Sequence, residues 1–236
     1  MSTRRRANLT NKLKIKQFEF KEELTYRNTA VLNYTIRFPE FQSGVAKFQK
    51  AVLTMNRFYR QEALHMVKHS RKNLYCDAVA QYHDSVEHGY PVMTYEVYVD
   101  NTVTYNENCA VSLYTDQYIF TGGAHGNTTR DSNTWDLLSG KKMPLSRFIA
   151  SPLYPKEYVV SQVIKQIQEQ IQNGGNYYFD DYEKNAVSEF DEDQFYLRPD
   201  GLVVYYQQYA IAPYSSGIRE FLLPFSSAVL QPRCRR

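Results

Sequence analysis

Two patterns of apolar residues divide the N-terminal part of the chain into a strand and a long helix. Apolar side chains interrupt polar neighbours at short spacing over residues 24–38, which is typical of a strand, and Pro39 is expected to end it. From Val45 the apolar side chains recur at steps of three and four residues, which indicates an amphipathic helix. The pattern closes at Gly89, so we expect a helical block over residues 43–88.

Alternating apolar and polar residues then predict three strands, and a helical pattern follows them. The strands are expected at residues 93–105, 109–121 and 128–137, with turn chemistry at Asn106-Glu107-Asn108. Their succession along the chain predicts an antiparallel meander. Apolar side chains at helical spacing over residues 156–172 predict a second helix, which two glycines terminate.

The C-terminal part of the chain predicts a hairpin and a final strand. Residues 195–197 and 202–206 flank the turn Pro199-Asp200-Gly201, and residues 218–225 form the last strand. Because helices and strands occur in separate runs, the predicted fold class is α+β. We expect an antiparallel sheet that packs against one long and one shorter helix.

The composition fits one folded domain. Of the 236 residues, 43% are hydrophobic and 21 are tyrosine, which excludes disorder over most of the chain. We expect residues 20–230 to form a single domain behind a basic, flexible leader of residues 1–19. No run reaches the roughly 18 apolar residues of a membrane-spanning helix. No apolar segment follows the basic start as it would in a secretory signal. Both absences favour a cytoplasmic location.

The net charge of +3 combines basic ends with an acidic body. Residues 1–16 hold six basic residues and no acid, and the last four residues hold three arginines. The remaining 19 basic residues face 25 acidic ones, a net charge of −6 for residues 17–232. A negative net charge over these residues, with no stripe of basic side chains, argues against a nucleic-acid partner. Seven acids and one base fall within residues 180–193, which predicts either a solvated loop or an acidic face for a cationic partner.

Cysteines and histidines give no sign of a metal or a cofactor. Three cysteines are too few for a disulfide framework, and no Cys-x-x-Cys occurs. Two alternatives stay open: a bridge between Cys76 and Cys109, or three free thiols, and we favour the free thiols. His65 and His69 lie four residues apart on the predicted helix, but no third ligand accompanies them. We therefore predict no metal site and no cofactor.

Three glycines surround a histidine at the end of a predicted strand. This loop consists of Gly122, Gly123, Ala124, His125 and Gly126. Its spacing is neither that of a dinucleotide-binding turn nor that of a phosphate loop. Glycines permit backbone conformations that other residues avoid, so we expect a tight structural turn that holds His125 in a fixed hydrogen bond.

A hydrolase that uses His125 as its base is the alternative interpretation. Such a site needs a nucleophile and an orienting carboxylate beside the histidine. Asp131 and Asp136 are close in sequence, but no Gly-x-Ser-x-Gly elbow or cysteine signature occurs. We therefore predict no catalytic residue and no enzymatic activity, and a serine or cysteine within about 3 Å of His125 would favour the hydrolase.

A second loop, at residues 210–217, presents a tyrosine after a proline. Pro213, Tyr214 and Ser215 form its centre. A tyrosine that is pre-organised by a preceding proline makes contacts at a small entropic cost, so these three residues are the predicted partner-binding residues. The alternative is a turn in which Tyr214 folds back onto the core.

The order of these motifs is similar to a known domain family. Gly-Gly-Ala-His-Gly at residues 122–126 precedes Asp136-Leu-Leu-Ser-Gly-Lys141 and Leu145-Ser-Arg-Phe148, and the closing stretch runs from Phe195 to Gly217. This arrangement resembles the extracytoplasmic domain of RsiV-type anti-sigma factors, which also accompanies PdaC-type peptidoglycan deacetylases. The resemblance divides the chain into a PdaC-associated half at about residues 20–140 and an RsiV C-terminal-like half at about residues 141–230.

The resemblance implies a non-enzymatic binding domain of the bacterial cell envelope. RsiV-type domains bind lysozyme over its cleft, so the implied partner is a lysozyme-like cationic protein or a peptidoglycan-related ligand. The deacetylase module of PdaC-type proteins has no counterpart here, and neither has the sigma-binding segment of the anti-sigma factors. Relatives commonly carry a glutamate before Ile-Ala-Pro-Tyr, where this chain has Ala210.

Overall fold

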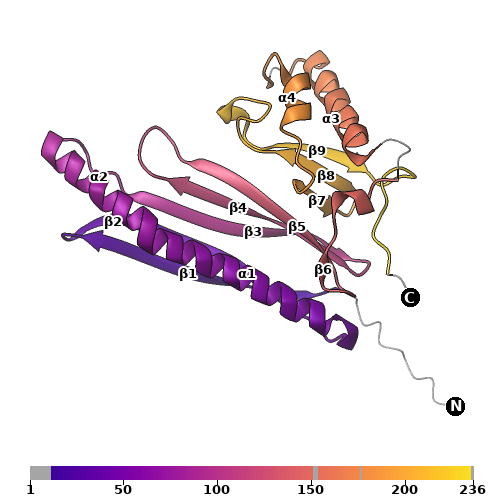
Figure 1. The fold of residues 1–236 in the computed structure, drawn as a ribbon, viewed down its shortest axis with the longest axis horizontal. Helices are drawn as coiled ribbons and strands as arrows, with labels where there is room; N and C mark the ends of the chain where they lie inside the picture. The colour runs from indigo at the N-terminus through magenta and orange to yellow at the C-terminus, as the bar shows by residue number, and fades with distance from the viewer. Residues whose placement is uncertain (1–11, 151–153, 176, 235–236) are drawn as a thin grey trace.

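A long helical segment lies along a six-stranded sheet, and a smaller three-stranded sheet with two helices forms the C-terminal part (Figure 1). The computed structural model describes residues 12–150, 154–175 and 177–234. The strand order is β1-β2-β3-β4-β5-β6 in the large sheet and β7-β8-β9 in the small one. The α+β class is confirmed, and so is the combination of a large sheet with one long and one shorter helix.

The first two strands form one long hairpin. β1 (Lys14–Tyr26) pairs antiparallel with β2 (Thr29–Gln42) through a turn at Arg27 and Asn28, which both have positive φ. The single strand expected over residues 24–38 is therefore wrong, because the turn divides it.

The flexible leader expected at residues 1–19 is wrong from Lys14 onward, where β1 begins, and residues 1–11 lie outside the described residues. Pro39 does not end a strand but lies inside β2. Its missing N–H is tolerated because β2 pairs with β3 only over residues 32–36.

The predicted helical block connects β2 to β3 and makes these two strands parallel. It comprises η1 (Ala46–Phe48), α1 (Gln49–His69), a π-helical turn η2 (Ser70–Leu74) and α2 (Tyr75–His88), and Gly89 caps it in the left-handed conformation. A crossover of this length is what a parallel pair requires. The helices bury their apolar face on the sheet, and Trp135 Nε1 donates to the hydroxyl of Tyr59 at 2.9 Å in that core.

The predicted meander is present. β3 (Tyr95–Glu107), β4 (Ala110–Phe120) and β5 (Asn127–Asp136) pair antiparallel, and the two-residue strand β6 (Lys141–Lys142) follows. The turn between β3 and β4 is centred on Asn108 and Cys109, which have positive φ, rather than on residues 106–108.

The C-terminal strands form a sheet of their own. β7 (Phe195–Arg198), β8 (Gly201–Tyr206) and β9 (Arg219–Pro224) pair antiparallel, and α3 (Pro155–Gln172) packs on them through buried apolar residues. The sequence predicts all three strands and α3 but misses α4 (Tyr182–Ser188), which lies in the acidic stretch, and the short 3-10 turns η3 (Leu145–Arg147) and η4 (Tyr214–Ser216). β7 contacts β3, β4 and β5, so the small sheet packs on the large one.

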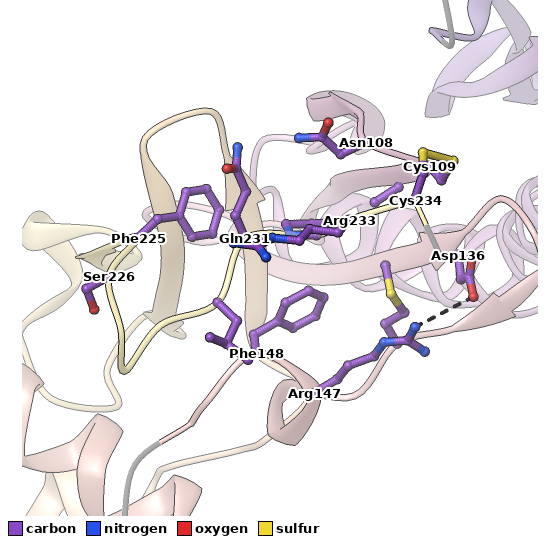
Figure 2. Close-up of a pocket in the computed structure, with 14 residues that line it drawn as sticks. Asn108, Cys109, Asp136, Arg147, Phe148, Phe225, Ser226, Gln231, Arg233 and Cys234 are labelled. Atoms are coloured by element: carbon purple, nitrogen blue, oxygen red, sulfur yellow. Dashed lines mark ion pairs between the residues drawn. A yellow bond between two sulfur atoms is a disulfide. The ribbon is translucent and has the colours of Figure 1, made fainter. Parts of the chain in front are cut away.

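Cysteine pairing differs from both alternatives left open by the sequence. Cys109 forms a disulfide with Cys234, 125 residues further along the chain, and Cys76 is exposed and free. The bridge joins the β3–β4 turn to the C-terminal tail (Figure 2).

Candidate aromatic binding site

The two loops singled out by the sequence meet in the structure. The rings of His125 and Tyr214 stack with centroids 3.8 Å apart and planes 18° from parallel. The hydroxyl of Tyr214 donates to the backbone oxygen of Gly126 at 2.9 Å. The ring of Tyr209 lies 5.6 Å from that of Tyr214 and is 53% exposed. We call His125, Tyr209 and Tyr214 the aromatic patch.

The glycines give the first loop its shape. Gly122 and Gly123 have φ of +94° and +89°, a region that side chains disfavour. Gly126 is required for another reason. A Cβ at this position would lie 2.5 Å from the ring of Tyr118 and 2.7 Å from the backbone oxygen of Ile119. The loop therefore packs backbone against β4 at Gly126, which leaves Ala124 and His125 exposed.

His125 makes contacts that suit a structural ring. Its side chain is exposed, and its Nδ1 lies 3.0 Å from the backbone oxygen of Gly126. Asp131 instead accepts from Gln117, and Asp136 accepts from the turn that follows β5. Across the described part of the chain, no serine, cysteine or carboxylate is hydrogen-bonded to His125.

Two glutamines fasten the second loop to the edge of β5. The side-chain amide of Gln207 accepts from the N–H of Arg130 at 3.0 Å and donates to its C=O at 2.7 Å. Gln208 Oε1 accepts from the N–H of Thr128 at 2.9 Å. These amides occupy backbone groups that a further strand would use. No sequence signal marks these two residues, because neighbouring glutamines have no characteristic turn chemistry.

The ring of Tyr214 is partly covered, which lies between the two alternatives that the sequence left open for it. Pro213 and Ser215 are exposed, but Tyr214 is half-buried against the glycine loop. Tyr209, which is not one of the predicted contact residues, has the more exposed ring and a φ of +66°. Tyr214 therefore supports a surface whose exposed rings are Tyr209 and His125, and neither of these two was a predicted contact residue.

A buried arginine joins the two sheets beside this surface. Arg130 on β5 is 8% exposed; its Nε and Nη2 bind Asp116 on β4 at 2.6 and 2.7 Å, and its Nη1 pairs with Glu220 on β9. Its guanidinium also lies 3.7 Å from the ring centroid of Tyr114. Burial opposes the charge of Arg130, but both carboxylates favour it and together raise its pKa above the usual value.

The acidic segment, residues 180–193, begins beside the second loop. The N–H of Phe179 donates to the backbone oxygen of Ile211 at 3.1 Å, and Ser216 Oγ donates to the backbone oxygen of Tyr177 at the same distance. The segment then forms α4 and returns to the large sheet, where Ser132 Oγ donates to the backbone oxygen of Asp193 at 3.1 Å.

The end of the acidic segment lines a cleft of about 450 Å³ against β5 and α1. Burial raises the pKa of Asp131 in this cleft, although nearby Lys142 opposes the shift. Burial lowers the pKa of Lys142, against the attraction of Glu62, Asp193 and Asp131. Among the described residues, no ion pair within 4 Å joins the ammonium group of Lys142 to a carboxylate of this cleft.

His65 and His69 both lie on α1. Within residues 12–150, 154–175 and 177–234, no group of three or more histidine, cysteine or carboxylate side chains is arranged to hold a metal ion. The helices in these ranges include none that is long and apolar enough to cross a membrane.

Two family models match separate segments of the chain. The model described as Deacetylase PdaC matches residues 25–128, and the model described as a protein of unknown function, DUF3298, matches residues 148–226. His125 lies in the first segment, whereas Tyr209 and Tyr214 lie in the second. The aromatic patch is therefore formed where the two matched segments meet.

Two crystal structures have a similar fold over most of the chain. A DUF3298-family protein from Bacteroides fragilis is 18% identical, with a TM-score of 0.68, and the match covers 91% of this chain and 92% of that one. A DUF3298-family protein from Pseudomonas aeruginosa is 16% identical, with a TM-score of 0.59 and 92% of both chains covered. A search of curated proteins found no match. At these identities the likeness shows the fold alone.

Proposed function

We propose that this protein is a non-enzymatic binding domain whose aromatic patch recognises a lysozyme-like cationic protein. The stacking of His125 on Tyr214 carries the proposal, because it makes one exposed surface from two loops that are distant in sequence. Exposed aromatic rings on a fixed backbone supply contact area at a small entropic cost and are common hot spots of protein interfaces. The amides of Gln207 and Gln208 keep this backbone in place.

The charge of the neighbouring acidic segment supports a cationic partner. Seven acids and one base lie within residues 180–193, and the segment starts directly after Phe179, which is bound to the second loop. Such a surface accelerates association with a positively charged protein, and the acceleration weakens as salt is added. The resemblance to RsiV-type domains, which bind lysozyme, agrees with this charge pattern.

Calorimetry with a cationic lysozyme at low and moderate salt tests the proposal. We expect measurable binding that weakens with salt, and an increase in Kd of about tenfold for Tyr209→Ala, which corresponds to about 1.4 kcal/mol. Tyr154→Ala is the matched control, because Tyr154 is 79% exposed at the start of α3, outside the two loops that form the aromatic patch.

Three results would contradict the proposal. The first is the absence of heat at both salt concentrations from a protein whose circular dichroism shows that it is folded. The second is an equal response of Tyr209→Ala and Tyr154→Ala. Cosedimentation with purified peptidoglycan in place of lysozyme binding would contradict the protein partner and identify a cell-wall ligand instead.

A further inference from the structure

A pocket lies at the opposite end of β5 from the aromatic patch. It has a volume of about 660 Å³ and opens between the β3–β4 turn, the end of β5, the segment around η3 and the C-terminal tail (Figure 2). β5 has ten residues, so about 30 Å separate its two ends. The pocket is thus independent of the surface assigned to the protein partner.

The C-terminal tail forms one wall of this pocket and is fixed on both sides of it. On one side, the N–H of Leu230 donates to the backbone oxygen of Phe148 at 2.7 Å. On the other side, Cys234 is bonded to Cys109. Residues 231–233, which we call the strap, cross between these two attachments and line the pocket (Figure 2).

Two arginines line the pocket from different elements. Arg147 comes from η3 and Arg233 from the strap. Among the described residues Arg233 has no ion pair, and the only carboxylate near Arg147 is that of Asp136 at 3.9 Å. That carboxylate already accepts from the N–H of Leu138 at 2.9 Å and from the hydroxyl of Ser139 at 3.0 Å. The two guanidinium groups therefore keep donors available for a ligand.

The charge and shape of the lining define the ligand class. Two arginines against one aspartate leave the lining positive, and guanidinium groups bind phosphate and carboxylate oxygens in a paired geometry. The partly exposed side chains of Phe225 and Leu230 supply apolar surface in the same pocket, whereas Phe148 is only 2% exposed. Pockets for small molecules commonly combine apolar walls with a few convergent polar groups.

We propose that this pocket binds an organic anion whose phosphate or carboxylate group pairs with Arg147 and Arg233 while its apolar part lies against Phe225 and Leu230. The disulfide belongs to the site, because it holds the strap and with it the backbone next to Arg233. Loss of the disulfide is therefore expected to weaken anion binding.

Calorimetry of the full chain at low salt with phenyl phosphate, benzoate and inorganic phosphate tests the proposal. We expect at least one aromatic anion to bind saturably and more tightly than inorganic phosphate, and the anion that binds identifies the preferred head group. Arg147→Gln and Arg233→Gln should each raise Kd about tenfold or more. Arg57→Gln should leave Kd unchanged, because Arg57 is an exposed arginine on α1 that does not line this pocket.

A protein without the disulfide adds a second readout. Cys109→Ser with Cys234→Ser should weaken binding of the same anion, with folding checked by circular dichroism at the temperature of the titration. The proposal is overturned if the folded wild-type protein binds neither aromatic anion, or if both arginine variants bind as the Arg57 variant does. Equal affinity for inorganic phosphate and phenyl phosphate would also overturn it, because the apolar walls would then contribute nothing.

Discussion

The two ends of the β4–β5 hairpin are built in different ways. At one end, two loops are held together by ring stacking and by side-chain amides that bind the edge of β5. At the other end, a disulfide and backbone hydrogen bonds hold the C-terminal tail across a pocket. The first end presents exposed rings, which suit the surface of a protein. The second encloses a volume lined by arginines, which suits a small anion.

The difference shows how one hairpin supports two kinds of recognition. Rings that stack on each other hold an exposed surface in place without enclosing a ligand. A covalent bond between positions 125 residues apart closes a long segment of the chain and keeps a wall in position. Substitutions at each end of the hairpin distinguish the contribution of ring stacking from that of the disulfide.

The largest effect is expected from removing the disulfide. Cys109→Ser should lower the free energy of unfolding by about 4–5 kcal/mol, the loop-closure entropy of a bridge between residues 125 positions apart. Urea unfolding measures this, and Cys76→Ser is the control, since Cys76 is free and exposed. An equal loss in both variants would contradict the assigned pairing.

Substitution of Gly126 should have the next largest effect and should act on the other end of the hairpin. The Cβ of Gly126→Ala would lie 2.7 Å from the backbone oxygen of Ile119, which cannot move without shifting β4. We expect a loss of about 1–3 kcal/mol in thermal or urea unfolding. Gly44→Ala is the matched control, because nothing lies within 4 Å of that position. Equal stability of the two variants would show that the loop does not pack on β4.

The two glutamines that bind the edge of β5 should differ in importance. Gln207 makes two hydrogen bonds to the backbone of Arg130, whereas Gln208 makes one to Thr128. Gln207→Ala should therefore lower stability by about 1–2 kcal/mol and Gln208→Ala by about half of that. Chemical unfolding of both variants provides the comparison, and a larger loss for Gln208→Ala would show that the amide bridge to Arg130 is unimportant.

The smallest effect concerns Asp131 in the cleft beside β5. Burial raises the pKa of Asp131 in the folded protein, so its contribution to stability is most favourable below its ordinary value of 3.8 and is lost as the pH rises through the folded pKa. Asp131→Asn removes that loss. The free energy of unfolding of the variant should therefore rise relative to that of the wild type between pH 3 and pH 6. The gain should stay below about 1 kcal/mol because Asp131, although surrounded by protein atoms in the cleft, still has an exposed surface that water screens. Urea unfolding measures this difference. A variant whose stability falls relative to the wild type over this pH range would contradict the raised pKa of Asp131.

Local chemistry explains what the sequence predicts correctly and what it misses. The helical period up to Gly89, the meander and the C-terminal hairpin depend on neighbours in sequence, and all were predicted. β1 was missed because its solvent-facing charged residues look like a basic leader, and α4 was missed because its residues look like a solvated acidic loop. The Cys109–Cys234 bridge and the anchoring role of Gln207 depend on partners far along the chain. The sequence predicts both candidate loops, but it does not predict the contact between His125 and Tyr214 that joins them.

The most direct test of the aromatic patch is a double-mutant cycle on stability between His125 and Tyr214. The free energies of unfolding of His125→Ala, Tyr214→Ala and the double variant, compared with the wild type, isolate the interaction between the two rings. Stacked rings 3.8 Å apart predict a coupling of about 0.5–1.5 kcal/mol. Additive losses, with a coupling of zero, would show that the two loops do not form one surface and would contradict the account of this site.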